Sequence, residues 1–337
     1  MQAAIYGLSG PVMTDEERDF FRDSDPAAYI LFKRNCIDPE QVRALTDSLR
    51  ALSGRDDLPI LIDQEGGRVA RMKPPGWPDF PCGWEFARLY ETAPSSAIEA
   101  ARANARALAL MLRDSGVNVD CLPLLDVRRP EADEIIGDRA LGSEPMQVAA
   151  LGRAVLDGLR SGGVVGVIKH IPGHGRALCD SHKELPVVDA SASELETDLE
   201  PFEALSWAPM GMMAHVVYTA WDPERPASQS ATVIAEIVRG RIGFSGWLMS
   251  DDIGMEALSG GFGERAAQVV EAGCDAALHC SGKMEEMVAV AAAVPAMSAE
   301  GQERLKRAMA AIAGEDAEDG PGFAEAIAKR DALLALA

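Results

Sequence analysis

The chain has 337 residues, with 53 acidic and 32 basic side chains and a formal charge of −21. Apolar residues make up 47% and charged residues 25%, a balance typical of a globular protein rather than a disordered one. Such an excess of carboxylates argues against nucleic acid or an anionic membrane as partner, because phosphate groups would be repelled.

The N-terminal residues lack the basic and apolar regions of a secretory signal before Pro11. No apolar run approaches the roughly 20 residues that cross a bilayer. The six cysteines form no CxxC pair and are typical of reduced thiols in a chain of this length. We therefore expect a cytoplasmic protein.

Short apolar runs alternate with segments of helical spacing along the chain. Such runs are typical of parallel strands that are covered on both faces. The predicted strands are Ala3–Tyr6, Tyr29–Phe32, Leu58–Ile62, Val117–Leu122, Val164–Ile168, Met210–His215, Trp247–Ser250 and Ala276–Leu278.

Helical patterns fill most of the gaps between these runs. Thr14 and Glu17 predict a capping box at the start of the first helix. Further helices are predicted at Gln41–Ala51, Ala97–Ser115, Val148–Leu159, Ala231–Arg239, Arg265–Ala272, Glu285–Val294 and, after an acidic loop at Glu315–Gly320, Phe323–Leu336. Eight strand–helix units predict an α/β fold, a single (β/α)8 TIM-type barrel over residues 1–337 with a C-terminal helical tail. An open doubly wound sheet is the alternative, although no GxGxxG follows the first strand.

Polar residues gather where the predicted strands end, which is where a barrel builds its active site. Asp63 and Arg71 follow the third strand, and Asp126 and Arg139 follow the fourth. His215 ends the sixth strand. Each residue alone is also compatible with a salt-bridged turn or a surface charge. A planar guanidinium also suits sugar hydroxyls or a carboxylate.

The densest polar segment follows the fifth strand. It reads Lys169-His170-Ile171-Pro172-Gly173-His174-Gly175, then Asp180-Ser181-His182, and holds three of the five histidines. A carboxylate two residues before an imidazole can hold its tautomer and stabilise its cation. Asp180 and His182 are therefore candidates for a general acid/base pair.

The seventh strand ends in two adjacent carboxylates, Asp251 and Asp252. Neighbouring carboxylates repel each other unless one is hydrogen-bonded or has a chemical task. We expect one of them to cap a helix and the other to react.

Two chemistries fit these residues. A metal hydrolase would use His170, His174 and His182, but histidines four apart need a helix that Pro172 and the glycines oppose. Glycosyl transfer by double displacement needs a nucleophilic carboxylate and a proton shuttle, which Asp251 and His182 would supply. A sugar-binding module without catalysis is the third interpretation.

The segment from Lys169 to His182 resembles the signature of family 3 glycoside hydrolases. More narrowly, it is similar to the bacterial cytoplasmic β-N-acetylglucosaminidases of peptidoglycan recycling. Supporting motifs occur in the family's order over nearly the whole chain: Ile62-Asp63-Gln64-Glu65-Gly66-Gly67-Arg68, Ile136-Gly137-Asp138-Arg139, Met213-Ala214-His215 and Ser250-Asp251-Asp252-Ile253-Gly254-Met255. Ile171 stands where phenylalanine is commoner, and Leu141 stands where an aromatic is frequent, which affects the expected pocket shape.

The resemblance implies retaining exo-hydrolysis of terminal N-acetyl-β-D-glucosamine. It implies Asp251 as nucleophile, His182 as acid/base and Asp180 as the partner of His182. The implied sugar-binding residues are Asp63, Arg71, Arg139, Lys169 and His170. It implies a monomer that uses no metal or cofactor, with an N-acetylglucosaminyl-anhydromuropeptide or a similar glycan as substrate. Because a neutral imidazole does not repel phosphate, phosphorolysis of the same bond stays an alternative.

Overall fold

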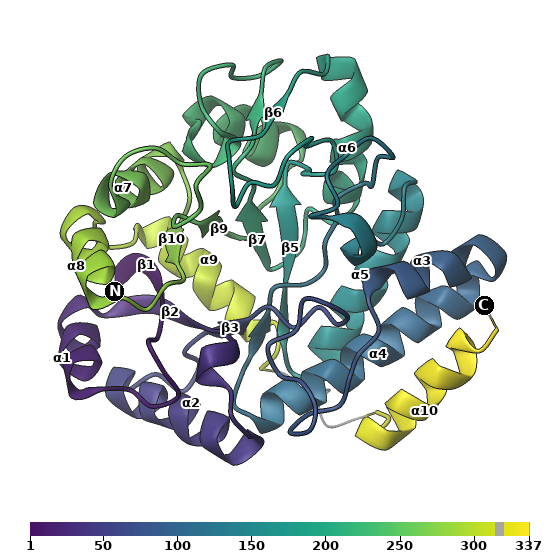
Figure 1. Ribbon diagram of the computed structural model, residues 1–337, viewed down its shortest axis with the longest axis horizontal. Coiled ribbons are helices and arrows are strands. Elements are labelled where there is room, and N and C mark those ends of the chain that lie inside the picture. Colours follow the sequence, from purple (N-terminus) through teal and green to yellow (C-terminus); the bar gives the residue numbers. More distant parts are fainter. Residues whose placement is uncertain (314–319, 337) are drawn as a thin grey trace.

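Eight parallel strands close into a barrel in the computed structural model, which describes residues 1–313 and 320–336 (Figure 1). The strands are β1 (Gln2–Gly7), β2 (Pro26–Leu31), β3 (Ile60–Ile62), β4 (Val119–Asp120), β5 (Val165–Ile171), β7 (Met210–Met213), β9 (Trp247–Asp252) and β10 (Ala276–His279). Each strand pairs with its neighbour in this order, and β10 pairs with β1. All eight predicted strands are present, although β4 is shorter than predicted and β7 ends at Met213 rather than His215. The closed ring rules out the open sheet.

Helices surround the ring (Figure 1). They are α1 (Asp15–Ser24), α2 (Pro39–Ser53), α3 (Gly83–Thr92), α4 (Pro94–Asp114), α5 (Pro145–Ser161), α6 (Ala192–Ala204), α7 (Phe262–Ala272), α8 (Met284–Ala293), α9 (Ala299–Ala310) and α10 (Phe323–Leu334), with short 3-10 helices η1 (Lys33–Asn35), η2 (Gly137–Arg139) and η3 (Ala227–Gln229). The capping box of Thr14 and Glu17 is present at the start of α1. The predicted helix at Ala231–Arg239 is mainly a π-helix, η4 (Val233–Arg241), because apolar spacing does not separate the two hydrogen-bond patterns.

Helices α3, α6 and α9 were not predicted. The predicted acidic loop at Glu315–Gly320 lies, apart from its last residue, outside the described residues. No helix among the described residues has both the length and the apolar character needed to cross a membrane. All six cysteines are free.

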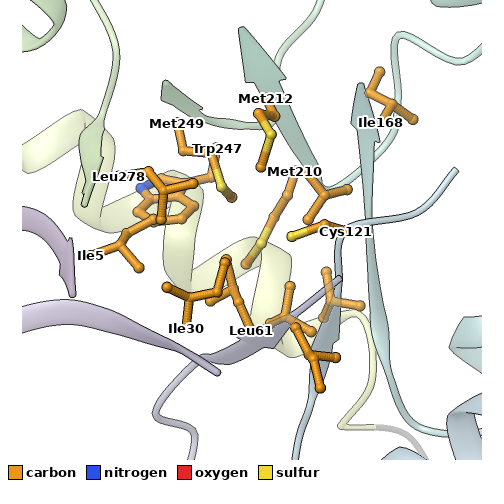
Figure 2. Packing of buried hydrophobic residues seen from close by; sticks show 14 of the residues in the cluster. Ile5, Ile30, Leu61, Cys121, Ile168, Met210, Met212, Trp247, Met249 and Leu278 are labelled. Carbon is orange, nitrogen blue, oxygen red and sulfur yellow. The ribbon is translucent and has the colours of Figure 1, made fainter. Parts of the chain in front are cut away.

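Apolar side chains from successive strands fill the ring. Figure 2 shows them lying together, with Ile5, Ile30, Leu61, Met210, Met249 and Leu278 among them. Because side chains alternate between the two faces of a strand, every second residue belongs to this interior row. The same alternation decides which residues face the open end of the barrel.

A small second sheet lies beyond the strand ends. It pairs β6 (Val187–Val188) with β8 (Val217–Tyr218). The main-chain N–H of Val217 also donates to the carbonyl of Pro186 over 2.9 Å. This sheet joins the segment after His182 to the segment after β7.

Candidate active site

A cavity of about 270 Å³ lies at the carboxyl ends of the strands. Some of the side chains that line it continue the inward-facing alternation of their strands. Asp63 lies two residues beyond Leu61, Lys169 two beyond Val167, and Asp251 two beyond Met249. The cavity is lined by Ile30, Phe32, Asp63, Glu65, Arg68, Val69, Arg71, Ile135, Ile136, Arg139, Lys169, His170, His174, Ser181, His182, Met212, Asp251, Asp252, Leu278 and Cys280.

Five charged side chains form a continuous ion network along one wall. Lys169, which is 2% exposed, lies 2.9 Å from Oδ1 of Asp63 and 2.7 Å from Oε1 of Glu65. Arg71 donates to the other oxygen of Asp63 over 3.1 Å. Arg139 grips Glu65 with two hydrogen bonds of 2.8 Å each.

This network keeps its members charged despite their burial. Burial alone would raise the pKa of Asp63, but the charges of Lys169 and Arg71 hold it well below its usual range. For Glu65, the charges of Arg139 and Lys169 outweigh burial and lower the pKa to about 2. Burial opposes the charged form of Lys169, but the two carboxylates raise its pKa. The wall therefore offers fixed charges and hydrogen-bond donors to a polar ligand.

The loop after β3, which carries Asp63, Glu65 and Arg71, turns sharply after Glu65. The N–H groups of Glu65 and Gly66 both donate to the carbonyl of Val69, over 2.9 and 3.1 Å. Gly66 has a φ of +95°, and a Cβ there would lie 2.2 Å from the carbonyl oxygen of Pro81. Only glycine fits this turn, which aims Glu65 at Arg139.

Asp126 accepts hydrogen bonds from two histidines, His170 and His174. Its Oδ2 lies 2.7 Å from Nδ1 of His170, and its Oδ1 accepts the main-chain N–H groups of His170 and His174 over 3.2 and 2.6 Å. Burial opposes ionisation of Asp126, but the adjacent charge of His170 and these hydrogen bonds lower its pKa to about 2. Because a carboxylate only accepts hydrogen bonds, Nδ1 of His170 carries a proton and Nε2 is left for the cavity.

The two adjacent aspartates have separate tasks. Asp252 accepts the N–H groups of Gly254 and Cys280 over 2.9 and 3.2 Å, so it stabilises a turn. It does not cap a helix as expected, because the next helix starts only at Phe262. Asp251 lines the cavity and accepts the N–H of Asp252 over 2.8 Å. Burial opposes its ionisation, but the charge of His170 and the hydrogen bond from the N–H of Asp252 help to lower its pKa below the ordinary value.

His215 lies beneath the aspartate pair and is fully buried. Its Nε2 is 3.1 Å from the main-chain carbonyl of Asp252, and its Nδ1 is 2.7 Å from Oγ of Ser228. A carbonyl oxygen only accepts, so Nε2 carries the proton and Nδ1 accepts from Ser228 when the ring is neutral. Burial lowers the pKa of His215, which favours this neutral form.

His182 lies at the edge of the cavity on the segment after β5. Its side chain is 62% exposed, and its Nδ1 is 2.8 Å from Oδ1 of Asp180. The same oxygen accepts the main-chain N–H of His182 over 2.9 Å. Burial opposes ionisation of Asp180, but the hydrogen bonds from His182 lower its pKa. The carboxylate therefore holds the proton of His182 on Nδ1 and leaves Nε2 for a ligand.

The predicted site residues thus fall around one cavity. Asp63, Arg71, Arg139, Lys169, His170, His182 and Asp251 line it, whereas Asp180 contacts it through His182. The sequence did not assign Glu65, Asp126 or His174 a role in sugar cleavage, although Asp126 was noted at a strand end, His174 was considered as a metal ligand, and Glu65 stands in a quoted motif. In the described part of the chain, no group of three or more His, Cys, Asp or Glu side chains is arranged to hold a metal ion.

Comparison with known proteins identifies the family of this chain. The sequence matches the Glycosyl hydrolase family 3 N terminal domain over residues 3–313. The chain belongs to glycosyl hydrolase family 3. Two curated relatives are the β-hexosaminidases of Alkalilimnicola ehrlichii, 40% identical over 282 residues, and Stenotrophomonas maltophilia strain K279a, 38% identical over 281 residues. The matches cover 82% of this chain and 80% and 82% of those proteins. The family 3 assignment makes the chain a glycoside hydrolase.

Solved structures of the family share the fold. NagZ from Neisseria gonorrhoeae in complex with N-trifluoroacetyl-D-glucosamine is 33% identical, with a TM-score of 0.87 over 99% of this chain and 98% of that one. A family 3 β-N-acetylglucosaminidase from Paenibacillus sp. is 29% identical, with a TM-score of 0.80 over 98% of this chain and 60% of that one. The family 3 barrel therefore spans nearly all of the present chain.

Proposed function

We propose that this chain is a retaining exo-β-N-acetylglucosaminidase that acts through a covalent glycosyl–Asp251 intermediate. One observation carries the proposal: the Asp251 carboxylate and the Asp180-bound imidazole of His182 face the same cavity. A retaining glycosidase needs a nucleophilic carboxylate and a proton shuttle on opposite sides of the scissile bond. The β-hexosaminidase relatives and the NagZ complex with an N-acylglucosamine support N-acetylglucosamine as the sugar.

In the first step, an oxygen of Asp251 attacks the anomeric carbon. The bond from that carbon to the glycosidic oxygen breaks, and protonated His182 gives its Nε2 proton to the departing oxygen. Asp180 stabilises the imidazolium before transfer and keeps the remaining proton on Nδ1 afterwards.

In the second step, neutral His182 takes a proton from water. The resulting hydroxide attacks the anomeric carbon, and the carboxylate of Asp251 departs. Two inversions restore the β configuration, and His182 is protonated again for the next cycle.

The ion network would bind the sugar rather than react with it. Asp63, Lys169 and His170 would bind ring hydroxyls, and the guanidinium groups of Arg71 and Arg139 would bind further oxygens. Because these groups are already fixed by one another, little order is lost when the sugar enters. The cavity size of about 270 Å³ suits one sugar ring, which supports cleavage from the end of a glycan.

We further propose that the natural substrate is an N-acetylglucosaminyl-anhydromuropeptide or a similar cytoplasmic glycan, and that the protein acts as a monomer. The named relatives support the glycan class. Size-exclusion chromatography with light scattering would measure the mass against 35.9 kDa for one chain.

Trapping tests the mechanism. A fluorinated N-acetylglucosaminyl fluoride, whose covalent adduct turns over slowly, is expected to add one sugar mass to the peptide that contains Asp251. Absence of any adduct under conditions where the fluoride is consumed would contradict double displacement. The same assay, run with phosphate, reports the alternative reaction, because phosphorolysis would release sugar 1-phosphate.

The metal alternative is tested separately. Elemental analysis of the purified protein, and the rate after dialysis against a chelator, are both measured. The proposal expects the nitrophenyl N-acetyl-β-glucosaminide rate to be unchanged by the chelator, whereas a metal hydrolase would lose it.

A further inference from the structure

One buried side chain lies within a partly exposed segment beside the cavity. Between residues 178 and 185, all of which the structure describes, only Ser181 is buried, at 3% exposure. The side chain of His182 next to it is 62% exposed. Burial of a small polar side chain directly beside an exposed one requires contacts that hold it there.

Ser181 is held from two sides. Its Oγ lies 3.2 Å from Nε2 of His174, and its carbonyl accepts the N–H of Ala257 over 3.2 Å. His174 is itself fixed, because Asp126 accepts its main-chain N–H over 2.6 Å. Burial and the charge of His170 lower the pKa of His174 to about 4, so its ring is neutral and can share one hydrogen bond with the hydroxyl.

These contacts connect the two proposed reacting groups. Ala257 follows the turn that Asp252 starts, in which the N–H of Met255 donates to the carbonyl of Asp252 over 3.1 Å. The segment that ends in Asp251 and Asp252 is thereby tied to the residue before His182. Ser181 is thus hydrogen-bonded to the segment that follows Asp251 and is adjacent in the chain to His182.

We propose that Ser181 is a positioning residue, whose hydroxyl bond to His174 holds His182 at the working distance from Asp251. This inference rests on the proposed function, since it assigns Ser181 a task only through His182. Ser181 does not react. Its loss leaves Asp180 and His182 intact but lets them move relative to Asp251.

The diagnostic variant is Ser181→Ala, which removes the hydroxyl and little volume. We expect kcat for the nitrophenyl N-acetyl-β-glucosaminide to fall by about tenfold to a hundredfold, a part of what acid/base catalysis supplies. Because nitrophenolate departs with little help from the acid, kcat/KM is expected to change by less than about threefold, and KM falls together with kcat as the glycosyl–Asp251 intermediate accumulates. Ser181→Thr keeps the hydroxyl and is expected to recover part of the lost rate.

Azide provides the readout that a merely structural role would not move. Azide attacks the anomeric carbon of the glycosyl–Asp251 intermediate, a carbon–nitrogen bond forms, and the carboxylate of Asp251 leaves without help from a base. Sodium azide is therefore expected to raise kcat of Ser181→Ala and to yield the β-glycosyl azide, with little effect on the wild type. The matched control is Ser259→Ala, an exposed serine close to Ala257, which is expected to behave as the wild type.

The outcomes separate this inference from the mechanism on which it rests. If His182→Ala has a low kcat that azide restores, while Ser181→Ala matches Ser259→Ala, the positioning role of Ser181 is wrong and the mechanism stands. A Ser181→Ala protein that melts at the wild-type temperature but shows a raised KM and no azide effect also contradicts the positioning role of Ser181. If His182→Ala keeps full activity, the acid/base assignment of His182 is wrong, and so is the positioning role of Ser181.

Discussion

Glu65 and Arg139 are joined by two hydrogen bonds of 2.8 Å in a fork-to-fork pair, although they lie on different loops, 74 residues apart in the chain. The glutamate side chain is only 4% exposed, and it also contacts Lys169 at 2.7 Å. One carboxylate therefore balances two buried cations at the cavity wall.

Glu65→Gln removes that balance and should destabilise the fold. The variant leaves two buried cations short of one anion, and breaking a buried pair costs about 3 kcal/mol or more. We expect the free energy of unfolding, measured in urea, to fall by about that amount, and KM to rise. Asp47→Asn is the control, because Asp47 forms an exposed pair with Arg43 at 3.0 Å that is worth about 0.5 kcal/mol. A loss below about 1 kcal/mol for Glu65→Gln would show that the network serves binding alone.

The neighbouring aspartates should respond very differently to the same substitution. Asp251→Asn removes the proposed nucleophile and should lower kcat by on the order of a thousandfold or more. Asp252→Asn keeps an oxygen for the N–H groups of Gly254 and Cys280, so it should fold and retain activity within about tenfold. Nitrophenol release and circular dichroism measure both. Similar losses in the two variants would remove the special role of Asp251.

Replacement of His182 should be felt most by substrates with poor leaving groups. Without its proton, an alkyl or sugar leaving group is expelled about 10²- to 10⁴-fold more slowly, whereas a nitrophenolate needs little help. We expect kcat/KM of His182→Ala to show this split. Asp180→Asn, which keeps an acceptor for Nδ1 but loses the charge, should fall in between. Equal losses on both substrate types would argue against His182 as the acid.

Buried histidines should make the protein less stable below neutral pH. Burial lowers the pKa of both His174 and His279 to about 4, from an ordinary value of 6.5. Between these values the unfolded chain binds protons that the folded chain does not, so the free energy of unfolding falls as pH falls. The slope is up to about 1.4 kcal/mol per pH unit for each histidine.

Urea unfolding between pH 7.5 and 5 measures this slope. His279 does not line the cavity, so His279→Gln should flatten the dependence without a change in KM. Above pH 6.5 His279 is neutral in both the folded and the unfolded chain. The free energies of unfolding of the variant and the wild type should therefore change with pH in the same way there. Stability that rises on acidification over this range would contradict the assignment.

Strand alternation explains why much of the site could be predicted from sequence. Asp63, Lys169 and Asp251 each continue an inward-facing row, and a polar residue at the end of an apolar run is visible without coordinates. Glu65 could not be found this way. Its direction depends on the glycine turn at Gly66, and its partner Arg139 lies on a distant loop.

Other features were missed for different reasons. Asp126 was noticed as a strand-end carboxylate, but its role depends on three N–H groups that only the folded segment around His170 brings together. Helix α6 carried a readable signal, since Ser191 and Glu194 form a capping box at its start. The short helix α3 has no side-chain cap to announce it.

Several residues belong both to the packed core and to the cavity lining, among them Ile30, Met212 and Leu278. A change of shape at any of them therefore alters the volume available to the sugar at the same time as the packing of the barrel. Variation that improves stability without cost to catalysis has to be sought elsewhere, toward the amino ends of the strands. The layer of side chains that closes the cavity from inside the barrel is therefore the part of the enzyme least free to evolve.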